Sequence, residues 1–279
     1  MVDSTSAAGT SHDPVRIQEG GAASPAMGAV FANFRQYLMG WGVSDHPGLG
    51  VDLFRSGLAA PQFNGVVRVR SAAGPDVAAV RRELAGVPWW WWWVGPDSPE
   101  ETADALRHHG GRQLTVMPVM VRPLGDPVAG HDRPDDDART RFGLRVEPVR
   151  EGGRLRDLVR TYRTSMGIGP GPEAGMVRAE SQRGDNGDIV RLAAVLDGRV
   201  VGTTVLITAH SVAGIFLVHV AAEMRRQGVA TALTSAALRV GRERGMHFAA
   251  LVASPAGEPL YGRFGFTAAY KYRLFDFPD

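Results

Sequence analysis

Six consecutive residues in the second half of the chain are of the types that bind an anion: Arg225, Arg226, Gln227, Gly228, Val229 and Ala230. They follow an apolar run over 215–220 and precede a run with helical spacing over 229–244. The first turn of a helix leaves backbone N–H groups unpaired at the positive end of the helix dipole. Gly228 lets a phosphate approach closely, and Thr231 can add a hydroxyl. This spacing predicts a phosphate-binding turn between a strand and a helix.

The elements that position this turn can be predicted from the spacing of apolar residues. The run over 215–220 is a predicted strand, and Gly245 ends the helix that begins at the turn. The same periodicity predicts further strands over 142–149 and 247–254, a helix over 155–162, and a hairpin that turns at Asp197-Gly198.

The motif RRQGVA at 225–230 resembles the signature of the GNAT superfamily of acyl-CoA-dependent N-acyltransferases. That signature is Gln or Arg, two variable residues, Gly, one variable residue, then Gly or Ala. The sequence LYGRFGF at 260–266 is similar to the Tyr, three residues, Gly-Phe element of the same family. Apolar strands lie directly before and after the helix, as in that family. The resemblance covers residues 142–279, about half of the chain.

The resemblance implies a set of contacts with acetyl-CoA as co-substrate. The pantetheine arm would pair with the strand at Val218 and Val220, and the pyrophosphate would lie on the amides of 225–230, with Thr231 beside them. Tyr261 matches the position from which many members protonate the departing thiolate. A phenol near pKa 10 would do so at a cost of roughly 2 kcal/mol against a thiolate near 8.5. Ser254 stands where the family often has an Asn that contacts CoA.

The general base has two candidates, His219 and Glu223. His219 lies on the predicted strand and would titrate near neutrality, although a single strand histidine is more often a partly buried structural residue. Glu223 lies in the loop, where family members often carry an acid without a catalytic role. A lysine-like amine costs roughly 4.6 kcal/mol to deprotonate at pH 7 and an α-amine only about 1, so the need for a base depends on the acceptor.

The first half carries similar elements without the motif. Its strand-to-helix turn, RSAAGPDV at 70–77, lacks the arginine entry, and Pro75 removes an amide. A helix with a capping box at Ser98 and Glu101 is predicted before Gly110. This half resembles a degenerate GNAT copy in a tandem protein. The segment 164–187 of the second half is predicted to recognise the acceptor.

Five consecutive tryptophans, 89–93, occupy a predicted strand of the first half. Alternation places Trp89, Trp91 and Trp93 on one face and Trp90 and Trp92 on the other. A strand covered on both faces reads as a continuous apolar run, whereas a ligand box needs aromatic residues from several elements. The run is therefore interpreted as a structural wall, one face of which could border the acceptor pocket.

Composition excludes several classes of protein. Arg and Lys total 31 against 29 acidic residues, and a net charge of +2 is not the strong basic excess that is typical of nucleic-acid-binding proteins. There is no cysteine, and the eight histidines show no metal-ligand spacing, so no metal site is expected. No apolar run approaches the roughly 18 residues that span a bilayer, and the first residues do not form a secretory signal. We expect a cytoplasmic protein without a membrane partner. The sequence is compatible with a homodimer.

These observations predict an α/β (α+β) fold with two GNAT-like domains, each a mixed, mostly antiparallel sheet flanked by helices. The expected divisions are a disordered tail (1–26), a degenerate domain (27–122), a linker (123–141) and a catalytic domain (142–279). The expected function is acetyl transfer from acetyl-CoA to a primary amine of a small molecule or peptide. The alternatives are a protein N-terminal acetyltransferase and a non-catalytic acyl-CoA-binding sensor.

Overall fold

The computed structural model describes residues 27–44, 47–125 and 143–278. The predicted tail (1–26) and most of the predicted linker (123–141) lie outside the described residues.

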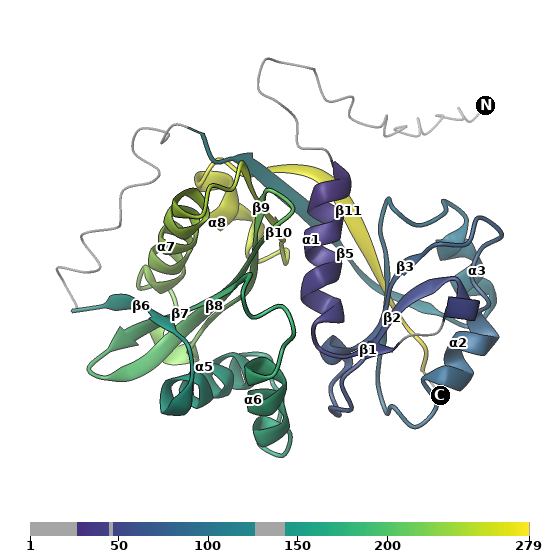
Figure 1. The fold of residues 1–279 in the computed structure, drawn as a ribbon, viewed down its shortest axis with the longest axis horizontal. Helices are drawn as coiled ribbons and strands as arrows, with labels where there is room; N and C mark the ends of the chain where they lie inside the picture. The colour runs from purple at the N-terminus through teal and green to yellow at the C-terminus, as the bar shows by residue number, and fades with distance from the viewer. Residues whose placement is uncertain (1–26, 45–46, 126–142, 279) are drawn as a thin grey trace, which may run out of the picture.

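The described residues form one eleven-stranded sheet with the order β1-β2-β3-β4-β11-β5-β10-β9-β8-β7-β6 (Figure 1). The strands of the first half are β1 (Val43–Ser44), β2 (Val51–Arg55), β3 (Asn64–Val69), β4 (Trp91–Val94) and β5 (Arg112–Pro123). The strands of the second half are β6 (Arg145–Val149), β7 (Ile189–Leu196), β8 (Arg199–Ala209), β9 (Val212–Val220), β10 (Phe248–Val252) and β11 (Thr267–Asp276). All pairs are antiparallel except β3 with β4 and β9 with β10. The mixed, mostly antiparallel sheet predicted from the sequence is confirmed.

Helices cover both faces of this sheet. They are α1 (Met27–Met39), α2 (Val77–Glu83), α3 (Thr102–His108), α5 (Gly152–Ser165), α6 (Glu173–Ser181), α7 (Val229–Glu243) and α8 (Glu258–Arg263), with short 3₁₀ turns η1 (Pro47–Leu49), η2 (Pro61–Phe63) and η3 (Ala222–Met224). One core unites α1, α5 and α6 with strands of both halves. Separate cores lie under α7 with α8 and under α2 with α3. In Figure 1, α1 stands between the two halves.

The two halves exchange their long last strands. β11, from the end of the chain, lies between β4 and β5, and pairs Leu274 with Trp93 of β4. β5, from the first half, lies between β11 and β10, and pairs Val119 with Val252 of β10. Each half therefore completes its part of the sheet with a strand of the other, and the sheet runs through both halves without a break.

Local turn chemistry follows the sequence at several positions. Asp197 (φ 48°) and Gly198 (φ 79°) form the predicted hairpin turn between β7 and β8, because this tight turn requires two residues in the left-handed region. Gly245 (φ 71°) ends α7 as predicted. The prediction of a capping box before α3 is wrong, because no side chain caps this helix. The Ser98 hydroxyl accepts a hydrogen bond from the backbone N–H of Val69 (3.1 Å) instead.

The tryptophan run is a strand for only part of its length. β4 begins at Trp91, and Trp92 is fully buried against α2 and α3. Trp93 packs on the opposite face in the shared core, as the alternation predicts. The prediction is wrong for Trp89, which precedes the strand and is 64% exposed, because the strand pairs only from Trp91 onward.

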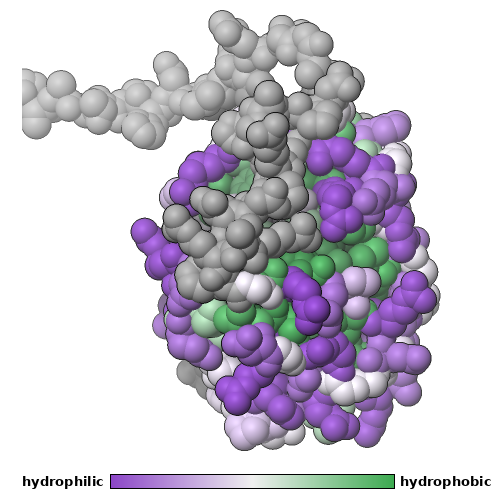
Figure 2. Space-filling view, turned by 90° about the vertical axis from the view of Figure 1, so that its left-hand side faces the viewer, coloured by the Kyte–Doolittle hydropathy of each residue, from purple (hydrophilic) through white to green (hydrophobic). Residues whose placement is uncertain are grey.

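Viewed from the side of α7 and β6, apolar side chains gather in the middle of the face and polar side chains surround them (Figure 2). Among the described helices, none is long and apolar enough to cross a membrane.

Candidate active site

The site is built around a bulge in β9. The pairing register with β8 shifts between Thr203 opposite His219 and Val205 opposite Phe216, and Leu217 has a φ of 50°. The Thr203 hydroxyl donates to the Leu217 carbonyl (2.9 Å), and the Thr204 hydroxyl donates to the Phe216 carbonyl (3.1 Å). These two hydroxyls satisfy carbonyl groups that the bulge removes from regular pairing.

From residue 215 onward, just before the bulge, β9 and β10 part from each other. Their parallel pairing is confined to 212–214 with 248–250, so the following residues of both strands have no partner across the gap. The side chain of Asn33 on α1 lies at this point, and its Nδ2 donates to the carbonyls of Ile207 (2.8 Å) and Val212 (2.9 Å). A cavity of about 260 Å³ opens between the separated ends. Backbone groups of these ends are therefore available to a ligand.

The predicted anion-binding turn lies where β9 ends and α7 begins. Gly228 occupies the N-cap with a φ of 81°, and no side chain caps the helix there. The N–H of Ala232 donates to the Gly228 carbonyl (2.9 Å), which leaves the N–H groups of 229–231 without a partner inside the helix. Arg226 has a φ of 64°, and the Gln227 amide donates to the Glu223 carbonyl (3.0 Å). The turn thus presents free N–H groups flanked by two arginines.

Tyr261 lies on α8 and lines the same cavity. Its ring is 8% exposed and packs edge-on against Phe266, with 6.0 Å between ring centroids. Burial raises the pKa of the Tyr261 phenol to about 12. The helix is held at its end by Arg122 of β5, which donates to the Phe264 carbonyl (2.6 Å). Ser254, which also lines the cavity, accepts from the Gly257 N–H (3.2 Å) before α8 begins.

His219 faces the cavity from β9. Its Nδ1 lies 3.1 Å from the Ser165 hydroxyl at the end of α5. Burial, and to a smaller extent the positive charge of Arg225, lower the pKa of His219 to about 4. The imidazole is therefore neutral at physiological pH. Glu223 is exposed in η3 and does not line the cavity, so the geometry favours His219 of the two candidate bases.

The predicted CoA contacts follow one another along the chain from the cavity to the start of α7. Val218 lines it, whereas Val220 pairs with Gly202 at the end of β9, next to the turn. The residues of the turn and of the first turn of α7 follow directly: Arg225, Arg226, Gln227, Gly228, Val229, Ala230 and Thr231. Val229 is buried beneath α7, so its contribution is limited to its backbone N–H.

A family profile described as the acetyltransferase (GNAT) family matches residues 155–266. Residues 155–266 therefore form a GNAT-family domain. No curated protein sequence matches the chain significantly.

Solved structures of GNAT proteins share the fold over two thirds of this chain or more. A GCN5-related N-acetyltransferase from Kribbella flavida is 15% identical, with a TM-score of 0.67 over 92% of this chain and 97% of that one. A GCN5-related N-acetyltransferase from Sphaerobacter thermophilus is 22% identical, with a TM-score of 0.52 over 67% of this chain and 59% of that one. An acetyltransferase from the GNAT family of Novosphingobium aromaticivorans is 14% identical, with a TM-score of 0.50 over 88% of this chain and 94% of that one. At these identities the likeness establishes the fold alone.

The first half supplies the other walls of the GNAT cavity. The residues concerned come from α1, η2, β4 and β5: Phe34, Tyr37, Leu38, Gln62, Phe63, Trp91, Trp93 and Met117. Of these residues, only the tryptophans were predicted from the sequence to border the acceptor pocket. Aromatic residues at helical spacing on α1, Phe34 and Tyr37, were a signal for a buried helix face, although not for the partner on which that face packs. Of the segment 164–187, only Met166 lines the cavity.

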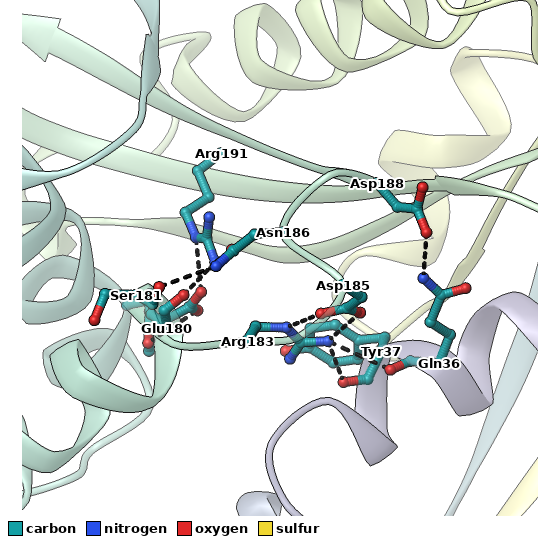
Figure 3. A network of polar contacts seen from close by, with 10 residues as sticks. Gln36, Tyr37, Glu180, Ser181, Arg183, Asp185, Asn186, Asp188 and Arg191 are labelled. Carbon is teal, nitrogen blue, oxygen red and sulfur yellow. Dashed lines mark hydrogen bonds and ion pairs between the residues drawn. The ribbon is translucent and has the colours of Figure 1, made fainter.

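A polar network fixes α1 against the GNAT domain (Figure 3). The Arg183 guanidinium donates to the Tyr37 carbonyl near the end of α1 (3.0 Å) and pairs with Asp185 (2.9 Å). A cation is favourable at a helix C-terminus, where the carbonyl groups lack partners. Gln36 of the same helix donates to Asp188 (2.8 Å). The segment after α6 therefore holds α1, the helix whose residues Phe34 and Tyr37 line the cavity.

The first half has no equivalent anion-binding turn between β3 and α2. The N-cap of α2 is Asp76, whose carboxylate accepts a hydrogen bond from the Ala79 N–H (2.9 Å). A carboxylate at this position occupies the helix N-terminus and repels a phosphate.

Proposed function

We propose that the chain is an N-acetyltransferase that moves the acetyl group of acetyl-CoA directly to a primary amine of a small molecule or peptide. One observation carries the proposal: the separated ends of β9 and β10, His219 and Tyr261 all face one cavity, and the N–H groups of 229–231 lack helical partners at the start of α7, the helix that follows β9. Family membership supports acetyltransferase chemistry at this place.

The residues of the site fit acetyl-CoA. Gly228 supplies a left-handed N-cap without a side chain, and the first-turn amides match a pyrophosphate. The unpaired backbone at Val218 suits the amides of the pantetheine arm, and Ser254 is a further contact. Acetyl-CoA would supply the activated acetyl group as a thioester.

The reaction requires one proton to leave nitrogen and one to reach sulfur. The amine lone pair attacks the thioester carbonyl carbon, the carbon–sulfur bond breaks, and sulfur leaves with the bonding electrons. Backbone N–H groups of the splayed strands would stabilise the negative charge on the carbonyl oxygen. We assign the proton from nitrogen to His219 and the proton to sulfur to Tyr261.

The perturbed pKa values constrain both roles. With its pKa near 4, His219 cannot deprotonate a free lysine-like ammonium, since that costs about 9 kcal/mol. It can accept a proton only after nitrogen has bonded to carbon, when the N–H is far more acidic. With its pKa near 12, Tyr261 protonates a thiolate of pKa 8.5 at a cost of about 5 kcal/mol. This cost is larger than that of a phenol with the ordinary pKa near 10. This cost lies below a typical activation barrier of about 16 kcal/mol. Burial of the thiolate raises the pKa of the thiol and so reduces the pKa difference between the two groups.

We also propose that the first half is a degenerate GNAT copy that no longer binds CoA. The carboxylate of Asp76 at the N-cap of α2 supports this, since it replaces the open anion site of α7.

The test is release of free CoA thiol from acetyl-CoA in the presence of a panel of primary amines, with mass spectrometry of the acetylated product. Thiol release that depends on the amine is expected. Binding of acetyl-CoA without release for any amine would instead show a sensor, and activity confined to peptide α-amines would show an N-terminal acetyltransferase.

A further inference from the structure

Aromatic side chains from several separate elements converge on the cavity that holds His219 and Tyr261. Tyr37 of α1 stacks on Phe216 of β9, with ring centroids 4.0 Å apart and planes 7° from parallel. Phe34 meets Trp93 edge-on at 5.2 Å, and Trp93 meets Trp91 edge-on at 6.2 Å. The cavity thus offers both ring faces and ring edges to a ligand, which suits a flat aromatic body or an ammonium group.

The lining of this cavity carries no formal charge. Within the described part of the chain, no Asp, Glu, Lys or Arg is among the lining residues. His219 is neutral at physiological pH. A carboxylate or a second ammonium on the acceptor would therefore find no counter-charge among the lining residues, which is unfavourable. Gln62 adds a neutral amide whose Oε1 is buried and has no hydrogen-bond partner, and this oxygen can accept an N–H of the ligand.

The volume of the cavity limits the size of the acceptor. About 260 Å³ corresponds to roughly nine water-sized groups and lies below the range of about 300–1,000 Å³ for drug-sized ligands. The acetyl thioester would take part of this space, since the ends of β9 and β10 line the same cavity.

We propose that the acceptor is a small monoamine with an aromatic body and no carboxylate, of the 2-phenylethylamine type, held by aromatic residues of the first half. This inference rests on the proposed acetyltransferase function. In this proposal the function of the first half is to supply the cavity walls that select the acceptor.

The test measures kcat/KM for thiol release with acetyl-CoA and four matched amines. They are 2-phenylethylamine, 2-cyclohexylethylamine, phenylalanine and spermidine. We expect 2-phenylethylamine to exceed phenylalanine and spermidine at least 100-fold, because each of these buries an extra charge. It should exceed the cyclohexyl analogue several-fold, because only the planar ring stacks. Equal or higher efficiency with any of the other three would overturn the inference. No thiol release with any amine would overturn the proposed function itself.

The tryptophan run offers a matched pair of variants. Trp91→Leu should raise the KM for 2-phenylethylamine about tenfold and leave the KM for acetyl-CoA within twofold. Trp89→Leu is the control, since Trp89 is 64% exposed and does not line the cavity, and it should behave as wild type. Thermal unfolding and the stabilisation by acetyl-CoA establish that each variant is folded. A folded Trp91→Leu with a wild-type KM for the amine would contradict the placement of the acceptor.

Discussion

Replacing Gly228 by Asp places a side chain and a negative charge at the anion-binding turn. If an acetyl-CoA phosphate lies about 4 Å from the new carboxylate, repulsion of one charge pair is about 4 kcal/mol at an effective dielectric of 20. That energy weakens binding about 1,000-fold. Acetyl-CoA at 100 times the wild-type Kd stabilises the wild type by about 2.7 kcal/mol, and the same concentration would stabilise Gly228→Asp by less than about 0.1 kcal/mol.

The backbone at Gly228 requires a matched control. Its φ of 81° is in the left-handed region, where a residue with Cβ costs roughly 1–2 kcal/mol, and Asp and Asn tolerate it best. Gly228→Asn has nearly the same shape and the same strain as Gly228→Asp but no charge. Both variants should unfold at lower temperature than the wild type by a similar amount, and only Gly228→Asn should keep a measurable part of the stabilisation by acetyl-CoA.

The assay is thermal unfolding of the three proteins with and without acetyl-CoA, with circular dichroism to verify folding. At about 2–4 °C per kcal/mol, the wild type should gain about 5–11 °C and Gly228→Asp should gain none. A folded Gly228→Asp that shows the full wild-type shift would refute the assignment of the pyrophosphate to this turn. Loss of the shift in Gly228→Asn to the same extent would refute the electrostatic part of the reasoning.

Three further predictions concern Tyr261, His219 and the first half. Tyr261→Phe should lower kcat by about 10²- to 10⁴-fold and leave the unfolding temperature and the affinity for acetyl-CoA nearly unchanged, because the ring and its packing are kept; a wild-type single-turnover rate would show that another group protonates the thiolate. His219 has a pKa near 4 in the folded protein and near 6.5 in the unfolded chain, so the unfolded chain binds more protons between these values and stability falls by up to about 3 kcal/mol as the pH drops from 6.5 to 4. Denaturant unfolding of His219→Gln should show a smaller loss over this range, and an unchanged pH dependence would contradict the burial of a neutral imidazole. Calorimetry should find one CoA site per chain, because Asp76 blocks the first half; two equivalent sites would refute the degeneracy of that half.

The elements of the proposed acetyl-CoA site could be predicted because they depend on neighbours in sequence. A left-handed N-cap needs glycine, so Gly228 marks the turn before any partner is known. The apolar spacing of α7 and the Asp197-Gly198 turn likewise express local backbone and side-chain preferences. Since Tyr261 lies in a motif of fixed spacing, its candidacy also followed from the sequence.

The aromatic side of the cavity, where we propose that the acceptor binds, could not be predicted, because it depends on which strands pair over long distances. β11 pairs with strands of the first half and β5 pairs with a strand of the second half. This exchange places Trp91 and Trp93 beside cavity residues such as His219, which are more than 100 residues away in the sequence. Alternation along the strand separates Trp91 from Trp92, but only the packing of α1 on one face and of α2 on the other makes one a cavity wall and the other core.

The pKa values of Tyr261 and His219 also depend on the tertiary structure. The sequence identifies a phenol and an imidazole, but their pKa values of about 12 and about 4 are consequences of desolvation by side chains from distant elements. The types of the reacting groups are thus local properties of the sequence. Their proton affinities, and the uncharged aromatic surroundings of the cavity, exist only when both halves pack on one sheet, since burial is a property of the tertiary structure.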